Sequence, residues 1–338
     1  MPISDSFLLR VLAPLCENLS IIFSKISCQS IDPLLLFSRM KKIKHVLEYV
    51  LLRLLSGLIR VLPLRLAFAL AWVLAWFSHR VIRFRVRSAR QRIHEVFGER
   101  FSRPEVNRIA WISWRNLCFT AIEVFRMQSI TKEYIAKYME TDQLSRLQNV
   151  ISSGTGAVLC VPHMGSWEMG GLSAHLMGIP FFFIARRQKN PLTDAYLHKR
   201  RQVTGADTMM SDDQGMLRNA VKRLKRGMVF AILPDVRSRT PALKIPFLNG
   251  EANIAQGTAL FAHLANVPVV PAYTRRVGWL RHAWSIGDPV YPDKTIDREK
   301  DLQRMTETIF NYFDQAIQET PEQYFWYNKR WVLDPLTE

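Results

Sequence analysis

The chain has 338 residues, of which 48% are hydrophobic and 22% are charged, a composition that excludes wholesale disorder. Lys and Arg number 46 against 29 Asp and Glu, so the formal net charge is +17 and the surface attracts polyanions. Nucleic acid, anionic lipid head groups and acidic carrier proteins are the partners that this charge admits. The 4 cysteines form no CxxC pair and no Cys/His ligand spacing, so neither a disulfide framework nor a structural zinc site is expected.

Residues 1–39 are a mixed stretch that lacks the basic region and clean apolar region of a secretory signal. The segment that begins at Met40 (MKKIK) looks like the natural beginning of a protein. Residues 1–39 are therefore expected to be an N-terminal extension that is absent from the native protein. Peptide mapping tests this, and a native peptide from residues 1–39 would disprove it.

The most apolar part of the chain, residues 47–77, is interrupted by three arginines and by Pro63. As a helix, residues 61–77 would span roughly 25 Å, which is short of the roughly 30 Å hydrocarbon core of a bilayer. Arg53 and Arg60 are seven residues apart and share one helical face, which favours a helix lying in the membrane interface. One short membrane span and a buried pair of core helices are the alternatives.

The next segment, residues 79–92, contains six arginines and no acid. A basic cluster directly after an apolar helix is typical of contact with anionic lipid on the cytoplasmic side of a membrane. A nucleic-acid-binding arm is the competing interpretation, although no recognisable nucleic-acid-binding module accompanies it. These features divide the chain into the extension (1–39), a membrane-anchoring region of hydrophobic and basic helices (40–95) and a folded domain (96–338).

After about residue 100 the pattern changes to short apolar runs that alternate with helical stretches. Strands buried on both faces are predicted at residues 157–162, 180–185, 228–233 and 267–273. Helices are expected between them, one opened by Ser211, one capped by Asn253, and a final one from about 297 to 319. The alternation predicts an α/β fold in which a central, largely parallel or mixed sheet is flanked by helices.

Polar side chains follow three of the predicted strands. His163 comes after the first strand, Arg186 after the second, and Asp235 with Arg237 after the third. In α/β sheets, chemistry usually takes place at the carboxyl ends of the strands. These side chains are therefore expected to meet at one rim of the sheet and to form a site.

His163 and Glu168 are five residues apart, so on one continuous helix they would lie on largely different faces. They can meet if His163 lies in the turn before a helix and Glu168 in its first turns. Glu168 could then hold one imidazole nitrogen while the other accepts a proton from a hydroxyl. Neither a GxSxG nucleophile elbow nor an HExxH zinc motif is present. A capping or core histidine is the alternative interpretation of His163.

The segment HMGSWE (163–168), placed after an apolar strand, resembles the histidine–x4–acid motif of the lysophospholipid acyltransferase superfamily. Its glutamate form and its surroundings resemble the lipid A late acyltransferases, the lauroyl/myristoyl transferase group. The resemblance runs from about Met40 to the C-terminus. Its segments occur in the family's order: WRNLCFTAIEVF (114–125), ARRQKNPL (185–192), LPD (233–235), GTALFAHLANVPVVPAYTRR (257–276) and TPEQYFWYNKRW (320–331).

The resemblance implies a glycerolipid acyltransferase-like fold in which His163 is the catalytic base and Glu168 its carboxylate partner. It places Arg186 at the acceptor or oxyanion site and makes Asp235 the aspartate of the strand-end turn. Arg237 resembles the family's arginine block only loosely. These last three residues are assigned to substrate binding.

The resemblance also implies the reaction: a fatty acyl group passes from acyl carrier protein to a hydroxyl, or a hydroxyacyl chain, of a lipid A precursor or related anionic glycolipid. An acidic carrier and a phosphorylated lipid at the cytoplasmic face of the bacterial inner membrane both suit the positive charge. This chemistry needs no metal, no organic cofactor and no nucleic acid. An acyltransferase for glycerol-based lysophospholipid is the alternative enzyme, and its motifs would be HxxxxD and EGTRS. A nonenzymatic membrane-surface protein and a nucleic-acid-binding protein are the alternatives from other classes.

Overall fold

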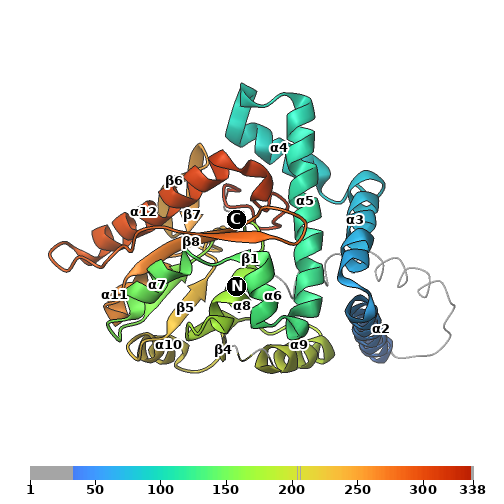
Figure 1. The fold of residues 1–338 in the computed structure, drawn as a ribbon, viewed down its shortest axis with the longest axis horizontal. Helices are drawn as coiled ribbons and strands as arrows, with labels where there is room; N and C mark the ends of the chain where they lie inside the picture. Colours follow the sequence, from blue (N-terminus) through green and yellow to red (C-terminus); the bar gives the residue numbers. More distant parts are fainter. Residues whose placement is uncertain (1–32, 204, 206, 336–338) are drawn as a thin grey trace.

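The protein is described by a computed structural model that covers residues 33–203, 205 and 207–335 (Figure 1). Most of the predicted extension, residues 1–32, lies outside the described residues. A seven-stranded sheet forms the centre, and the predicted α/β fold with a mostly parallel sheet is confirmed. Its strands, in spatial order, are β1 (Met139–Glu140), β9 (His282–Ile286), β8 (Val269–Arg276), β2 (Ala157–Cys160), β5 (Val229–Ile232), β3 (Phe181–Ala185) and β4 (Asp207–Met210). Neighbouring strands are parallel except β8 and β9.

Helices surround this sheet, and a separate hairpin of β6 (Leu243–Phe247) and β7 (Gly250–Ile254) lies beside it. In chain order the helices are α2 (Pro33–Val61), α3 (Leu64–Arg80), α4 (Val86–Phe97), α5 (Arg103–Arg126), α6 (Lys132–Tyr138), α7 (Leu144–Ile151), α8 (Trp167–Leu176), α9 (Pro191–Val203), α10 (Met216–Leu224), α11 (Gly257–Ala265) and α12 (Arg298–Glu319). Short 3-10 turns are η1 (Gly98–Arg100), η2 (Met127–Ser129) and η3 (Pro321–Gln323).

All four predicted strands form, as β2, β3, β5 and β8, and the last predicted helix is α12 with Asp297 as its N-cap. Two predicted helix starts are wrong. Asn253 lies in β7, where its side chain binds the backbone of residues 240 and 242, and α11 begins only at Gly257. Ser211 is not a cap either, because α10 begins at Met216 after a left-handed residue, Gly215. Asn253 belongs to a strand and Ser211 to a turn, so neither residue caps the helix that follows it.

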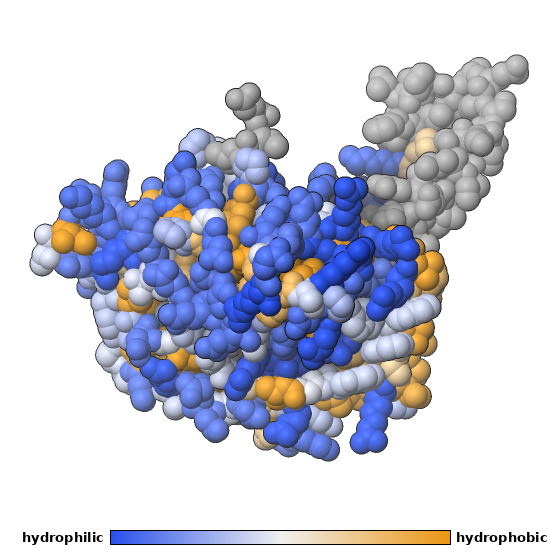
Figure 2. All heavy atoms as spheres, turned by 90° about the horizontal axis from the view of Figure 1, so that it is seen from above, coloured by the Kyte–Doolittle hydropathy of each residue, from blue (hydrophilic) through white to orange (hydrophobic). Residues whose placement is uncertain are grey.

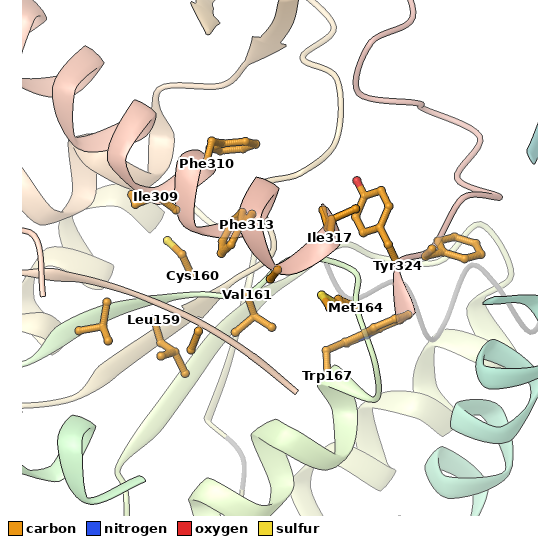
Figure 3. Close-up of a cluster of buried hydrophobic side chains, with 14 of the residues drawn as sticks. Leu159, Cys160, Val161, Met164, Trp167, Ile309, Phe310, Phe313, Ile317 and Tyr324 are labelled. Atoms are coloured by element: carbon orange, nitrogen blue, oxygen red, sulfur yellow. The ribbon is translucent and has the colours of Figure 1, made fainter. Parts of the chain in front are cut away.

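One part of the core lies between the sheet and α12. Figure 3 shows Ile309, Phe313 and Ile317 of α12 over Leu159 and Val161, at the end of β2. All five side chains are buried. Burying a side chain of this size contributes about 1.5–3 kcal/mol, so the strand end that precedes the predicted site is held rigidly.

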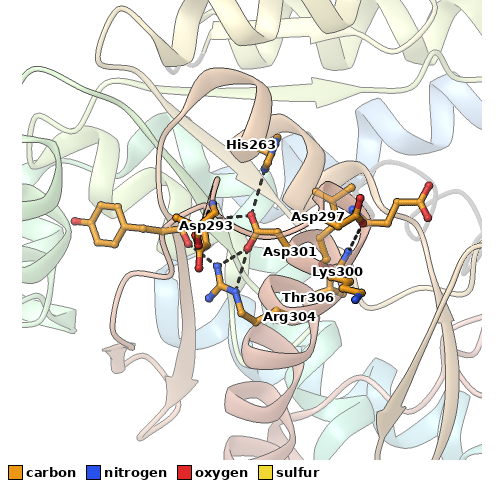
Figure 4. Close-up of polar contacts among 11 residues, drawn as sticks. His263, Asp293, Asp297, Lys300, Asp301, Arg304 and Thr306 are labelled. Carbon is orange, nitrogen blue, oxygen red and sulfur yellow. Dashed lines mark hydrogen bonds and ion pairs between the residues drawn. The ribbon is translucent and has the colours of Figure 1, made fainter.

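The first turn of α12 is fixed by a buried carboxylate, Asp301 (Figure 4). It accepts hydrogen bonds from the backbone of Asp293 at 3.0 Å and from Arg304 Nε at 3.0 Å, and it pairs with His263 Nδ1 at 3.2 Å. His263 belongs to α11. The contacts therefore join α12 to α11 and to the loop that precedes α12.

The N-terminal helices α2 and α3 pack on one side against α5. Phe68 of α3 meets Phe119 of α5 edge to face at 5.0 Å, and α2 ends where Arg126 of α5 donates to the carbonyls of Ile59 and Leu62 at 2.6 and 2.8 Å. The break at Pro63 separates the two helices.

The other side of α2 and α3 is exposed and apolar. Its residues are Ile43, Val46, Leu47, Val50, Leu54, Leu58, Leu66, Val73, Leu74, Trp76 and Phe77. Figure 2 shows apolar residues gathered along the right-hand edge, the side on which α2 and α3 lie in Figure 1. Within the described ranges, none of the helices combines the length and the apolarity that crossing a membrane requires. The two helices are thus half packed and half exposed.

The predicted boundaries at 39/40 and 95/96 both fall inside helices, α2 and α4. The buried residues of α4 belong to the main core. Arg92 of α4 is itself buried and donates to the carbonyls of Trp326 and Asn328 at 2.9 and 2.8 Å. The basic segment is therefore tied at this point to the C-terminal part of the chain.

Candidate active site

His163 lies in the link between β2, which ends at Cys160, and α8, which begins at Trp167. The prediction that it precedes a helix is confirmed, and its side chain is 1% exposed. Within the link, Gly165 has a φ of +60°, and a Cβ there would lie 1.9 Å from the carbonyl oxygen of Thr274. Only glycine suits this position, because a side chain would meet both backbone strain and a direct clash.

The C-terminal segment holds this link from the other side. The backbone N–H of Phe325 donates to the His163 carbonyl at 2.8 Å, and that of Gly165 donates to the Gln323 carbonyl at 2.9 Å. The Gln323 side chain in turn accepts from the Arg276 N–H at 2.9 Å and donates to the Arg276 carbonyl at 3.2 Å. The C-terminal segment, which the sequence analysis used only for the family resemblance, thus fixes the histidine's backbone.

Asp235 binds His163 at two points. Its Oδ1 is 2.6 Å from the ring atom Nδ1, and its Oδ2 accepts the His163 backbone N–H at 2.8 Å. A carboxylate accepts a hydrogen, so Nδ1 carries the proton and Nε2 keeps its lone pair. Nε2 is buried and has no hydrogen-bond partner. This is the arrangement of a general base, with one nitrogen held and the other free to take a proton.

From the sequence, Asp235 is expected to bind substrate and Glu168 to hold an imidazole nitrogen. In the structure Asp235 uses both oxygens on His163, and it is Asp235 that holds Nδ1. The cause is the sheet register: Cys160 of β2 pairs with Ile232 of β5, and the two functional residues follow these positions by three residues each. Glu168 lies half-buried in the first turn of α8, and its part in the reaction stays a prediction.

Tyr324 stands next to this pair and is 2% exposed. Burial raises the pKa of its hydroxyl well above the ordinary value, and the charge of Asp235 and a hydrogen bond to it raise this pKa further. The tyrosine is therefore neutral and donates to the carboxylate. With this bond the buried Asp235 carboxylate accepts hydrogen bonds from three donors, which offset the cost of burying its charge.

A buried ionic cluster lies beneath the link. Glu123 of α5 accepts from Arg276 at 2.8 and 2.9 Å, pairs with His282 Nε2 at 2.9 Å and accepts from the hydroxyl of Ser166 at 2.5 Å. Burial alone would raise the Glu123 pKa, but Arg276 and His282 lower it to about 2. Ser166 is the N-cap residue of α8, so this cluster connects α5, β8 and β9 to the start of the helix that follows His163.

Arginines gather beyond Asp235. Arg237 is half-buried, and its Nε and Nη1 have no hydrogen-bond partner. Arg330 donates to the Arg237 carbonyl. Burial lowers the Arg330 pKa, and the charges of Arg239, Arg186 and Arg237 lower it further. The predicted residues Arg186 and Arg237 therefore both act electrostatically on Arg330, and their part in substrate binding stays a prediction.

Among the residues that the structure describes, no three His, Cys, Asp or Glu side chains gather in a way that could hold a metal ion. The described cysteines, Cys118 and Cys160, are free thiols.

A histidine whose ring is held by a carboxylate, at the carboxyl ends of a mostly parallel sheet, has the geometry that general-base catalysis requires. Transferases that activate an acceptor hydroxyl use such sites. The chain belongs to the bacterial lipid A biosynthesis acyltransferase family, whose model matches residues 38–332. The family resemblance stated from the sequence is confirmed.

Individual relatives are distant. A phosphatidylinositol mannoside acyltransferase from Mycobacterium tuberculosis is 22% identical over 217 residues, which are 63% of this chain and 66% of that protein. A lipid A biosynthesis acyltransferase from Haemophilus influenzae is 23% identical over 199 residues, 58% of this chain and 60% of that protein. The chain thus spans less than two thirds of the length of either relative.

Among solved structures, the chain is similar to a 1-acyl-sn-glycerophosphate acyltransferase from Thermotoga maritima, with 15% identity and a TM-score of 0.35. The match covers 75% of this chain and 95% of that one.

Proposed function

We propose that this protein transfers a fatty acyl group from the thioester of acyl carrier protein to a hydroxyl of a lipid A precursor or a related glycolipid. We place the reaction at the cytoplasmic face of the bacterial inner membrane. The observation that carries the proposal is the unpartnered Nε2 of His163, backed by Asp235, in a chain that belongs to this family. The named relatives support a glycolipid acceptor, since one acts on phosphatidylinositol mannoside and another in lipid A biosynthesis.

The reaction follows from the geometry of His163. Its Nε2 takes the proton of the acceptor hydroxyl, and the acceptor oxygen forms a bond to the thioester carbonyl carbon. The carbon–sulfur bond then breaks, and the thiolate leaves with the proton from Nε2. Asp235 keeps the ring in the productive tautomer and stabilises the imidazolium between the two steps.

The arginine group formed by Arg186, Arg237 and Arg330 supplies positive charge close to Asp235. Guanidinium groups bind phosphate and carboxylate oxygens through charge-assisted hydrogen bonds. They are suited to hold a phosphate of the acceptor or of the donor's carrier, and to stabilise the oxyanion of the tetrahedral intermediate. The net charge of +17 favours an acidic carrier protein that approaches from the cytosol.

The exposed apolar side of α2 and α3 supports attachment to a membrane surface. It joins a chain segment, residues 79–92, that contains six arginines and no acid. An apolar helix face beside basic residues is the pattern of interfacial binding to anionic lipid.

The test is mass spectrometry of lipids after purified protein is mixed with an underacylated lipid A precursor and acyl carrier protein loaded with acyl chains of several lengths. His163→Ala serves as the matched control. We expect one acyl group to be added by the wild type and none by the variant. Parallel reactions contain phosphatidylinositol mannoside, a lysophospholipid, or acyl-coenzyme A in place of the carrier.

Each outcome decides one part of the proposal. Transfer to phosphatidylinositol mannoside alone keeps the mechanism and moves the acceptor to another glycolipid. Transfer to lysophospholipid alone overturns the acceptor class in favour of the glycerol-based alternative. Equal activity of His163→Ala overturns the mechanism, and no transfer to any acceptor overturns the enzyme assignment.

A further inference from the structure

A pocket of about 370 Å³ opens where α3 ends and α4 begins. It is separate from the His163–Asp235 pair, neither of which lines it. Its lining residues are His79, Arg80, Arg83, Val86, Arg87 and Arg90.

His79 is a buried polar member of this group, with 2% of its surface exposed. Its ring stands edge to face on Trp111 at 5.3 Å, and neither ring nitrogen has a hydrogen-bond partner. Burial, together with the charges of Arg80 and Arg90, lowers the His79 pKa to about 4, so the ring is neutral at neutral pH. A buried polar group without a hydrogen-bond partner is destabilising, and a polar ligand is one way to satisfy it.

The pocket is lined by four arginines, Arg80, Arg83, Arg87 and Arg90. In the described part of the chain none of the four forms an ion pair with Asp or Glu, and the Nε of Arg90 is buried without a partner. The other two arginines of the segment have structural tasks, since Arg85 and Arg92 donate to carbonyls of the C-terminal segment at 3.0 and 2.9 Å. The arginines of residues 79–92 therefore form two groups. Arg85 and Arg92 stabilise the fold, and the other four line the pocket.

The turn that shapes the pocket is strained. Arg83 and Arg85 have φ angles of 56° and 51°, in the left-handed region that non-glycine residues rarely adopt. Such strain is typical of ligand-binding turns, because the surrounding contacts must maintain it. Positively charged donors around a neutral histidine form a site for a phosphate group.

The approach to the pocket is apolar. Trp72 and Trp76 precede His79 on α3 by seven and three residues, so the three side chains lie along one stripe of the helix. Trp72 is 36% exposed and Trp76 is 45% exposed. Val81 and Ile82, between α3 and the pocket arginines, are also exposed. A phosphate attached to acyl chains matches this combination better than a free phosphate does.

We propose that this pocket binds the phosphate of a membrane lipid head group, with Arg83, Arg87 and Arg90 as donors and the lipid's acyl chains along Trp72 and Trp76. The inference rests on the proposed membrane attachment for the source of the lipid. It adds a defined lipid site at a distance in sequence from the reacting histidine.

The test measures flotation of the full chain with phosphatidylcholine vesicles that contain or lack phosphatidate. The protein carries His163→Ala, so that no acyl transfer alters the vesicles. We expect Arg87→Gln with Arg90→Gln to weaken binding to phosphatidate vesicles by about tenfold or more. The matched control is Arg218→Gln with Arg226→Gln, which removes the same charge from exposed positions at α10 and is expected to retain binding.

A second measurement identifies the group that is bound. Short-chain phosphatidate is titrated against histidine-labelled protein, and the His79 ring signal is assigned by its loss in His79→Gln. We expect this signal to shift with phosphatidate and not with inorganic phosphate at the same concentration.

Equal weakening by the pocket pair and the control pair would overturn the proposal in favour of diffuse attraction between charges. An unmoved His79 signal would overturn it as well, and an equal response to inorganic phosphate would overturn the lipid as the source. These results are independent of acyl transfer. Binding without acylation by the wild type contradicts only the proposed function, whereas acylation without binding contradicts only the pocket.

Discussion

Asp235 holds His163 by its backbone and its ring at once, with Oδ2 2.8 Å from the N–H and Oδ1 2.6 Å from Nδ1. The carboxylate thereby sets both the position and the tautomer of the base. The two residues lie close together because β2 and β5 are neighbouring parallel strands. Each residue follows the paired positions Cys160 and Ile232 by three residues.

Asp235→Asn is expected to lower kcat by about 10²–10⁴, because an amide does not stabilise the imidazolium and can impose the wrong tautomer. The measurement is single-turnover acyl transfer, with circular dichroism to show that the variant is folded. Glu168→Gln, which the sequence predicts to stay folded and lose most turnover, is measured beside it. A large loss in Glu168→Gln together with near-normal turnover in Asp235→Asn would restore the His163–Glu168 pairing.

Gly165→Ala is expected to destabilise the protein by several kcal/mol or prevent folding, since its φ is +60° and the new Cβ would lie 1.9 Å from the Thr274 carbonyl oxygen. Gly171→Ala is the matched control. It lies within α8 with no atom within 4 Å of the new Cβ, and it is expected to stabilise by about 0.5–1 kcal/mol. Urea unfolding compares the two, and equal stabilities would contradict the close approach of the link to β8.

Glu123→Gln is expected to cost about 3–5 kcal/mol at neutral pH, because it leaves Arg276 buried without its anion. The Glu123 pKa is lowered from 4.5 to about 2, so its ionisation stabilises the fold above pH 4.5, and this contribution is lost as the pH falls toward 2. This loss of unfolding free energy is on the order of 3 kcal/mol in the wild type and should be absent in Glu123→Gln.

Unfolding free energies between pH 6 and pH 2 measure this dependence. Glu140→Gln is the control: this acid is paired with Arg281 at the exposed edge of the sheet, where an ion pair contributes about 0–1 kcal/mol. Parallel stability profiles of wild type and Glu123→Gln would contradict the role of the buried cluster.

Trp76→Ser with Phe77→Ser is expected to reduce recruitment to anionic vesicles by about tenfold or more, because burial of each large side chain contributes about 1.5–3 kcal/mol. The two side chains are 45% and 47% exposed on α3. Leu217→Ser with Leu264→Ser, on α10 and α11 with 41% and 40% exposure, is the matched control and is expected to bind as the wild type does. An equal loss of vesicle binding in the two double variants would show that α3 is not the contact surface.

The sequence predicts much of the fold because its signals are local. As predicted, four apolar runs form buried strands, the last helix starts beside Asp297, and His163 lies between a strand and a helix. The two misplaced helix starts, at Ser211 and Asn253, show where local signals fail. A polar residue before a helical stretch caps the helix only if it does not already belong to a strand or turn, and Asn253 belongs to β7.

The partner of His163 could not be predicted in the same way. Glu168 was the nearest carboxylate in sequence, whereas Asp235 is 72 residues away and becomes the nearest through the pairing of β2 with β5. The roles of Glu123 and Tyr324 had no signal either, since their partners come from other elements.

By itself the sequence determined the α/β class, the histidine between a strand and a helix, the family and the excess of positive charge, because residue type and periodicity carry these properties along the chain. Only the tertiary structure decided which carboxylate holds Nδ1, which arginines of residues 79–92 support the fold, and which of them line a pocket. The physical reason is that hydrogen bonds and ion pairs depend on distances of a few ångströms between groups that the chain order leaves far apart.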